Sequence, residues 1–157
     1  MTDLYDLPGH LIRRLHQISV AIFASRMADA GIDLTPVQFA ALTKVDDNPG
    51  VDQATLAGLI AYDRVTMGGV VDRLVHKGLL RREVSRQDRR ARVLTLSEEG
   101  QRILARALPE VRAVQVETLA GLTDDERRTF VALLRKATDA ANDQSRAPLR
   151  LIDTEPG

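Results

Sequence analysis

Apolar residues recur with the spacing of α-helices along most of the chain, and the first such segment is apolar on two sides. It is predicted to run from Pro8 to Ala30, because proline suits a first helical turn and Gly31 favours a stop. A helix of this kind packs between a core and a partner, so we expect it to form part of a dimer interface. Its two stripes consist of Leu11, Leu15, Ile18 and Ile22 on one side and of Val20, Ala24 and Met27 on the other.

Capping and turn signals divide the rest of the chain into shorter elements. Thr35, Pro36 and Gln38 form a capping-box sequence that opens a second helix ending near Asp46. Further helices are predicted over 52–60, 64–77, 97–121 and 123–137, and two short strands over 79–85 and 91–96.

The order of these elements predicts a fold that is mainly α with a small β-hairpin wing. We expect a winged helix-turn-helix lobe over 35–96, joined to a helical dimerisation module made of 1–34 and 97–143. Residues 144–157 contain two prolines and little periodicity, so they are expected to form a flexible tail.

Composition excludes several classes of protein. The chain has no cysteine, which excludes disulfides, thiol catalysis and cysteine-based zinc sites, and its three histidines are scattered. No nucleophile–base pair, phosphate-binding loop or metal cluster is visible, so we expect no enzyme activity, no catalytic residues, no metal and no cofactor. No apolar run approaches the roughly 18 residues that span a bilayer, and the N-terminus has no signal-peptide pattern. We therefore expect a cytoplasmic protein without a membrane partner.

Charge is segregated along the chain although its net value is zero. A neutral protein can bind nucleic acid only through a local basic patch. Such a patch is present, because six arginines and only two acidic residues fall within 81–92. This segregation is the first indication of a DNA-binding function.

The predicted helix over 64–77 has the pattern of a DNA-recognition helix. Such a helix reads base edges with its N-terminal residues: Arg64 suits guanine, Val65 a thymine methyl group, and Thr66 a base or a phosphate. Any surface helix has a polar outer face, so this pattern alone does not establish DNA binding. Gly68 and Gly69 indicate close approach to another backbone, which could be DNA or a neighbouring helix. The outer face of the helix presents Val65, Gly69, Asp72, Arg73 and His76, where Asp72 opposes DNA binding unless it pairs locally with His76.

The predicted hairpin carries the second candidate contact. Arginines at a slender tip fit a narrow minor groove, where the negative potential is enhanced, and Asp88 could hold the Arg90 guanidinium in place. A solvated, charged turn is the alternative, so the DNA-binding prediction rests on the hairpin and the helix together. The candidate hairpin residues are Arg86, Asp88, Arg89, Arg90 and Arg92.

At these residues the sequence resembles the multiple antibiotic resistance regulator (MarR) family. The Asp88-Arg89-Arg90 wing pattern and its spacing from the segment Asp63–Leu80 carry the resemblance, which covers roughly 8–143. It implies a homodimer, a pseudo-palindromic double-stranded DNA operator and, usually, repression. It also implies that Arg90 enters the minor groove with support from Asp88. The Gly68-Gly69 pair departs from many relatives, which leaves the number of direct base contacts open.

The start of the first helix, Pro8 to Leu15, is similar to a branch of this family that responds to aromatic acids. The resemblance implies that Arg13 binds the effector carboxylate, and a guanidinium beside apolar surface can bind a planar carboxylate bidentately. Arg14 is the fallback, and a salt bridge across the dimer is the alternative role for either arginine. Further candidate effector-binding residues are His10, Ser19 and Gln38.

We therefore expect a repressor released from its operator by a small aromatic carboxylate or its thioester. A regulator without a ligand and an architectural DNA-binding protein remain the alternatives. Neither the effector, the operator sequence, the target genes nor the sign of regulation follows from the sequence.

Overall fold

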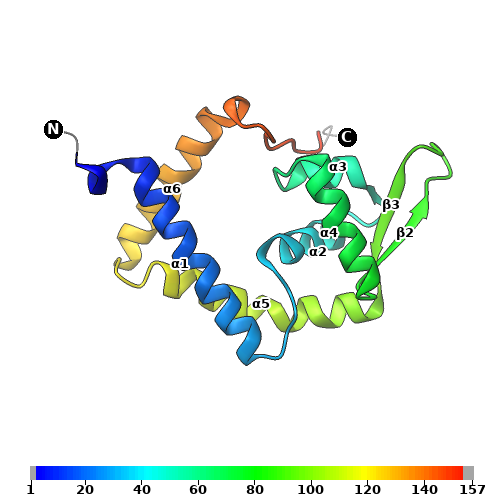
Figure 1. The fold of residues 1–157 in the computed structure, drawn as a ribbon, viewed down its shortest axis with the longest axis horizontal. Helices are drawn as coiled ribbons and strands as arrows, with labels where there is room; N and C mark the ends of the chain where they lie inside the picture. Colours follow the sequence, from blue (N-terminus) through cyan, green and yellow to red (C-terminus); the bar gives the residue numbers. More distant parts are fainter. Residues whose placement is uncertain (1–2, 154–157) are drawn as a thin grey trace.

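Helices form most of the chain in the computed structural model, which describes residues 3–153. The predicted class, mainly α with a small β wing, is confirmed (Figure 1). The α-helices are α1 (Pro8–Asp29), α2 (Pro36–Asp47), α3 (Gln53–Leu59), α4 (Arg64–His76), α5 (Glu98–Thr118) and α6 (Asp124–Ala140). The strands are β1 (Val51–Asp52), β2 (Leu80–Val84) and β3 (Arg92–Leu96), and short 3-10 turns lie at Leu4–Asp6 and Asn142–Gln144.

The helices begin where the sequence places their caps. At α2, Thr35 Oγ1 accepts a hydrogen bond from Gln38 N and Gln38 Oε1 accepts one from Thr35 N, both at 3.2 Å. Thr123 and Glu126 form the same reciprocal capping box at α6. Gly78 follows α4 with a φ of 73°, a left-handed conformation that glycine adopts at low cost, and it turns the chain towards β2. These local signals explain why the predicted helix boundaries lie within a few residues of those observed.

The sheet has one strand more than the sequence predicts. Its order is β1-β3-β2, and both pairs are antiparallel. Val51 of β1 pairs with Leu94 of β3, and Gly50 N donates a hydrogen bond to Leu94 O at 2.8 Å. Because Val51 and Leu94 are both buried, β1 fixes the base of the β2–β3 hairpin against the helices.

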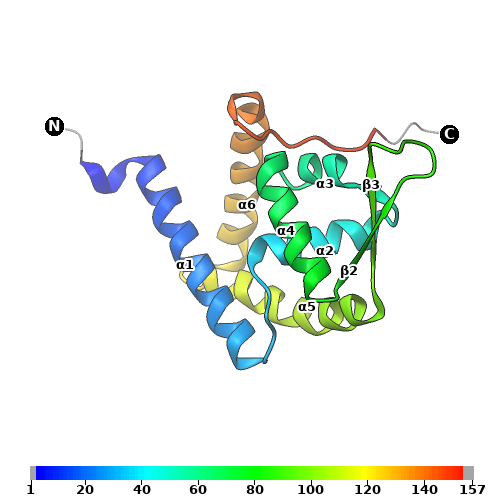
Figure 2. The same cartoon turned by 45° about the vertical axis from the view of Figure 1, so that its right-hand side comes forward.

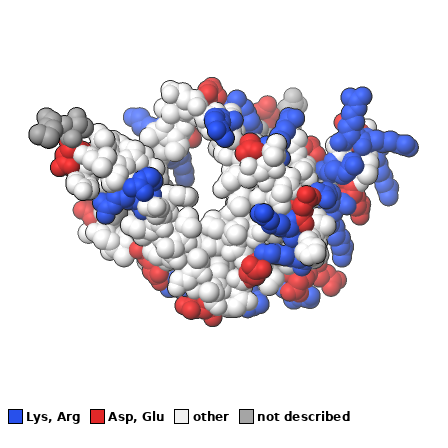
Figure 3. Space-filling view, in the orientation of Figure 1, with Lys and Arg blue, Asp and Glu red and all other residues white. Residues whose placement is uncertain are grey.

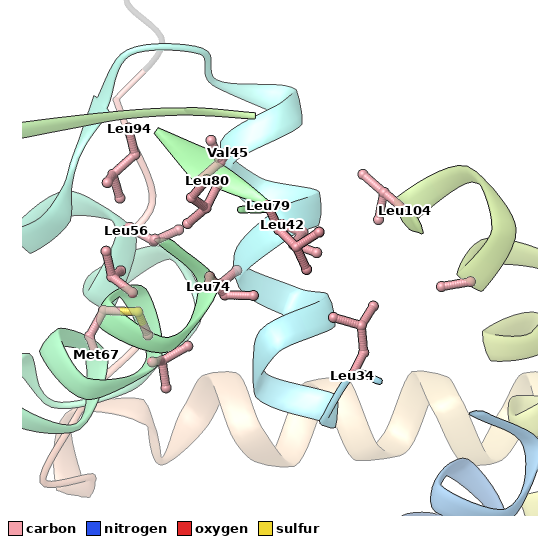
Figure 4. Packing of buried hydrophobic residues seen from close by; sticks show 14 of the residues in the cluster. Leu34, Leu42, Val45, Leu56, Met67, Leu74, Leu79, Leu80, Leu94 and Leu104 are labelled. Carbon is pink, nitrogen blue, oxygen red and sulfur yellow. The ribbon is translucent and has the colours of Figure 1, made fainter. Parts of the chain in front are cut away.

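An apolar core lies between α2, α3, α4 and the sheet. Leu42, Leu56, Met67, Leu74 and Leu94 have no exposed surface, and Figure 4 shows them converging from these elements. Burying one such side chain contributes about 1.5–3 kcal/mol. We call the segment 35–96 the winged lobe, and this core holds it together.

Helix α5 joins the winged lobe to the remaining helices. A Cβ at Gly100 would stand only 2.1 Å from the Leu79 carbonyl oxygen, so α5 starts in close contact with the segment before β2. Its first half contributes Leu104 and Ala107 to the core. It then extends beyond the lobe and packs against α1 (Figure 1).

Helices α1 and α6, with the second half of α5, form an arm beside the winged lobe (Figures 1 and 2). Phe23 and Met27 near the end of α1 are buried in the core, whereas α6 has no buried residue. Arg26 of α1 bonds Glu117 and Glu110 of α5, with 2.8 Å between Arg26 Nη1 and Glu110 Oε2. The hydrogen bonds that the Arg26 guanidinium donates to these two carboxylates raise the pKa of Arg26, so this ionic link holds α1 on α5.

Much of the apolar surface of the arm is open to solvent. Leu11 and Ile18 of the first predicted stripe are 44% and 46% exposed, and Val20 of the second is 38% exposed. Leu133 of α6 is 60% exposed. Single exposed apolar residues are ordinary on a protein surface, but here they follow two helices of the arm.

The end of the chain returns to the winged lobe, where the sequence analysis predicted a flexible tail from residue 144. Asn142 Oδ1 accepts a hydrogen bond from Leu149 N at 2.8 Å, and Asn142 Nδ2 donates one to Leu149 O at 3.1 Å. Arg150 N donates to the Gly58 carbonyl of α3 at 2.8 Å. These partners order residues 142–152, which we call the C-terminal strap and which lie along α3 (Figure 2). Residues 154–157 of the predicted tail lie outside the described residues.

Candidate nucleic-acid interface

Arginines from α4 and from the hairpin line one hollow on the winged lobe. Figure 3 shows a dense group of basic side chains at the end of the molecule that carries the β2–β3 hairpin. A surface of this charge attracts a polyanion. The two predicted DNA-binding elements therefore lie together in space. The hollow has a volume of about 400 Å³ and is lined by Asp52, Gln53, Ala54, Arg64, Asp88, Arg90, Ala91 and Arg92.

The N-terminus of α4 is fixed by Asp63. Its Oδ1 accepts a hydrogen bond from Thr66 N at 2.8 Å, and its Oδ2 accepts one from Thr66 Oγ1 at 2.7 Å. Both bonds lower the pKa of the Asp63 carboxyl below its usual value. Thr66 was predicted to contact a base or a phosphate. Its hydroxyl proton is used within the cap, so its oxygen is left to accept from an outside donor.

The outer face of α4 is exposed as the sequence predicts. Val65 is 87% exposed, and Gly69 and Arg73 also face solvent. A Cβ at Gly69 would meet no atom within 4 Å, and one at Gly68 would meet only Gln53 Nε2 at 3.6 Å. A helical glycine costs about 1 kcal/mol relative to alanine, and packing within this chain does not require either one.

Asp72 pairs with Arg82 of β2 rather than with His76. Arg82 Nη1 lies 2.6 Å from Asp72 Oδ1, in a salt bridge that links α4 to the sheet. The pair could not be anticipated from helical spacing, because its partner comes from a different element. It neutralises the one acidic side chain on the outer face of α4, and so removes a repulsion towards a polyanion.

The hairpin tip is ordered by hydrogen bonds to its backbone. Ser85 is buried, and its Oγ accepts hydrogen bonds from Gln87 N and Asp88 N, each at 3.2 Å. Asp88 Oδ1 accepts one from Arg90 N at 2.9 Å. Asp88 was predicted to hold the Arg90 guanidinium, and the structure corrects this: a turn of this kind brings the Asp88 carboxylate to the Arg90 backbone, so Asp88 shapes the loop.

The guanidinium groups of the hairpin point to solvent. Arg86, Arg89, Arg90 and Arg92 are all exposed. Arg92 Nη1 donates to Arg89 O at 3.4 Å. Within residues 3–153 the guanidinium groups of Arg86, Arg89 and Arg90 make no side-chain hydrogen bond or ion pair, so they are available to a ligand.

Gln53 is a candidate residue that the sequence analysis missed. It begins α3 and lines the hollow together with Arg64 and Arg90. Its Oε1 is buried and has no hydrogen-bond partner in the described part of the chain. A glutamine at the first position of a helix carries no sequence signal, which is why reading the sequence could not identify it.

The predicted effector arginines lie exposed on α1. Arg13 Nη1 donates to Gln17 Oε1 at 3.0 Å, and Arg13 Nη2 lies 3.4 Å from His10 Nδ1. Helical periodicity places Arg13 on the side of α1 that, further along, buries Met27. Arg14 is exposed next to it. The structure therefore brings Arg13 and His10 together.

The other two predicted effector residues lie elsewhere in the chain. Ser19 lines a largely apolar hollow of about 370 Å³ between α1, α5 and α6, together with His16 and Phe130. Gln38 is buried in the winged lobe, where its Oε1 accepts hydrogen bonds from Thr35 N and, at 3.1 Å, from Lys77 Nζ. Among the described residues, neither Ser19 nor Gln38 forms a hydrogen bond with Arg13.

Two negative findings apply to residues 3–153. No group of three or more histidine, cysteine, aspartate or glutamate side chains is placed to hold a metal ion. None of the helices in this range is both long and apolar enough to cross a membrane.

The fold and the arginine-lined surface define a winged helix-turn-helix protein. Residues 34–91 match the MarR family model. The transcriptional regulator HosA of Escherichia coli O157:H7 is 34% identical over 127 residues, which cover 81% of this chain and 91% of HosA. The transcriptional repressor NicR of Pseudomonas putida is 32% identical over 88% of this chain and 86% of NicR. The chain belongs to the MarR family of transcriptional regulators, which are DNA-binding proteins and not enzymes.

Solved structures agree with this assignment. PcaV of Streptomyces coelicolor, in complex with its natural ligand, superposes with a TM-score of 0.82 and 34% identity, over 90% of this chain and 98% of PcaV. Bordetella bronchiseptica BpsR, whose DNA binding is regulated by 6-hydroxynicotinic acid, gives 0.82 and 32%, over 88% and 98%. The repressor CouR bound to a 23-mer DNA duplex gives 0.78 and 28%, over 88% and 99%.

Proposed function

We propose that this chain is a homodimeric repressor that binds a pseudo-palindromic operator in the cytoplasm and is released by a small aromatic carboxylate or its thioester. The observation that carries the DNA-binding part is the shared hollow of Arg64, Arg90 and Arg92. A helix in the major groove and an arginine in the adjacent minor groove must be held at a fixed spacing. The relatives NicR, a repressor, and CouR, solved on DNA, support the same action here.

The exposed arm supports the homodimer. Apolar side chains are open on both α1 and α6, and α6 buries no residue within the protomer. Association of two arms around a two-fold axis buries the same surface on both chains. It also places two winged lobes side by side, as a two-fold symmetric operator requires.

The operator and the role of Arg90 can be tested with one set of duplexes. Full-length protein is used to select binding sequences from a random 30-bp pool, and enrichment of a pseudo-palindrome is expected. Replacing Arg90 with alanine should then weaken binding to the selected duplex by at least about tenfold, since hydrogen bonds to charged groups contribute about 1.5–3 kcal/mol. Arg102→Ala is the matched control, because the Arg102 guanidinium pairs with Glu99 on α5. Equal affinity of the Arg90 variant and the control contradicts the assignment of the hairpin.

Arg13 is the candidate effector-binding residue that the arrangement of α1 favours. Its guanidinium adjoins the His10 imidazole and lies on the side of α1 that faces the lobe further along the helix. A guanidinium can bind a planar carboxylate with two parallel hydrogen bonds. BpsR responds to 6-hydroxynicotinic acid, which has such a carboxylate on an aromatic ring. An effector bound between arm and lobe changes operator affinity only if it favours one lobe spacing over another.

A thermal-shift screen of aromatic carboxylates, with 6-hydroxynicotinate and benzoate included, tests this part. A ligand at about 100 times its Kd stabilises the folded protein by about 2.7 kcal/mol. Arg13→Ala should abolish the shift, whereas Arg14→Ala, the neighbouring exposed arginine, should retain it. A shift that survives in the Arg13 variant contradicts the proposed carboxylate site.

Two alternatives predict different results in these assays. A ligand-independent regulator selects a pseudo-palindrome but gives no thermal shift with any acid in the panel. An architectural protein enriches no sequence and shows affinity that falls steeply with salt. The proposed repressor requires both an enriched sequence and loss of its complex when the effector is added.

A further inference from the structure

Hydrogen bonds that involve its backbone hold the C-terminal strap in place on the winged lobe. Asn142 closes it into a loop through two hydrogen bonds to Leu149. Arg150 N then donates to the carbonyl of Gly58, near the end of α3, at 2.8 Å. The strap therefore has one defined position on α3, which Figure 2 shows above α3 and α4.

Gly58 makes room for the strap. Glycine inside a helix costs about 1 kcal/mol relative to alanine, and α3 is a short helix that ends at Leu59. A Cβ at Gly58 would stand 3.0 Å from Arg150 Cβ, closer than two such carbons normally approach. Glycine at position 58 therefore lets the strap pack closely against α3, a role that the sequence alone did not reveal.

The strap lies next to the residues proposed to read DNA. It borders a hollow of about 700 Å³ whose other wall includes Tyr62, Asp63 and Arg64, at the start of α4. Arg146 and Arg150 of the strap line the same hollow. Arg64 also lines the hollow of the hairpin arginines. Arg64 is therefore flanked by basic side chains from two separate parts of the chain.

The charges of the strap suit a phosphate backbone. Arg146 is exposed, and its side chain makes no hydrogen bond or ion pair with the described residues. The Arg150 side chain is 63% exposed and lies 3.1 Å from Asp143. The one acidic residue on the facing wall, Asp63, has its oxygens occupied by Thr66.

We propose that the C-terminal strap is a third DNA-contacting element, in which Arg146 binds a backbone phosphate beside the base pairs that α4 reads. Arg150 anchors the strap through its backbone N–H on Gly58, and its guanidinium pairs with Asp143. The proposal rests on operator binding by α4 and the hairpin. It adds a contact that carries no sequence information, because phosphate contacts position a protein on DNA without reading bases.

The test uses full-length Arg146→Ala and duplexes selected by the wild-type protein, with affinities measured from about 50 to about 200 mM salt. One phosphate contact adds about 0.9 to the slope of log K against log salt, or about a 3.5-fold change in affinity over this range. The variant should lose that part of the slope on every duplex, specific or random. Arg146→Lys should retain it, and so should the control Arg102→Ala, whose guanidinium pairs with Glu99 on α5.

Gly58→Val separates the contact from a merely structural role, because it displaces the strap and keeps both arginines. It should reproduce the loss of slope while the lobe stays folded by circular dichroism. An unchanged slope in Arg146→Ala overturns the phosphate contact. If Gly58→Val lowers the salt slope and Arg146→Ala does not, the phosphate contact is overturned as well, and the strap has only a structural role. Failure of the wild-type protein to bind any duplex contradicts the proposed function itself.

Discussion

The winged lobe and the arm differ in how far their apolar residues are buried. In the lobe, leucines pack into a shared core, where Leu42, Leu56 and Leu74 have no exposed surface. The arm leaves comparable residues open: Leu133 is 60% exposed and Val116 is 55% exposed. The two regions therefore differ in how far their apolar residues are buried.

This contrast indicates which region is complete within one chain. A lobe with a closed core has reached its stable packing, while an arm with two open apolar faces has not. The exposed arginines of the hairpin, Arg86, Arg89 and Arg90, belong to the lobe. We infer that the lobe supplies recognition and that the arm supplies association.

The largest expected effect comes from the core of the lobe. Leu42→Ala removes a side chain without exposed surface and should lower the free energy of unfolding by about 2–5 kcal/mol, since it leaves a cavity. Urea unfolding measures the free energy of unfolding, and the difference between wild type and Leu42→Ala should not depend on protein concentration. A loss below about 1 kcal/mol would mean that the lobe core is less tightly packed than the structure indicates.

A smaller but concentration-dependent effect is expected in the arm. Leu133→Glu should weaken self-association by about a hundredfold or more, because an unpaired carboxylate in an apolar interface costs several kcal/mol. Sedimentation equilibrium measures the dissociation constant. Val84→Glu is the matched control, since Val84 is an exposed apolar residue of the lobe at 51%. Similar behaviour of the two variants contradicts the division of roles.

The smallest effect concerns pH and the cap of α4. The Asp63 pKa is lowered by its bonds to Thr66, so the charged cap contributes its full stability above the ordinary aspartate pKa of about 3.9. That contribution is lost as the pH falls through the lowered value. Asp63→Asn keeps a capping side chain that does not titrate. The stability difference between wild type and variant should therefore narrow on acidification, and a constant difference would contradict the assigned cap.

The parts of the fold that could be predicted are those encoded by neighbouring residues. The Thr35 and Gln38 capping box, the Asp63 cap and the stop at Gly78 each depend on residues within one turn of a helix, and all three are observed. The buried face of α4 follows from the same local periodicity. The structure places Arg64 and Arg90 in one hollow, and their contacts with DNA stay a prediction.

The parts that escaped prediction depend on residues far apart in the chain. Strand β1 exists only through its pairing with β3, and Asp72 finds Arg82 rather than its helical neighbour. The strap lacks a pattern of its own because its partner is the carbonyl of Gly58. Every residue has a backbone carbonyl, so no pattern of side chains can predict which carbonyl accepts this hydrogen bond.

The central claim is that two lobes held by two arms read one operator. Hydroxyl-radical footprinting of the full-length protein on the selected duplex tests this directly. The account predicts two protected patches related by a two-fold axis and centred about 10 bp, one helical turn, apart, and it predicts that Leu133→Glu protects both only at much higher concentration. One protected patch that is unaffected by Leu133→Glu would contradict the account.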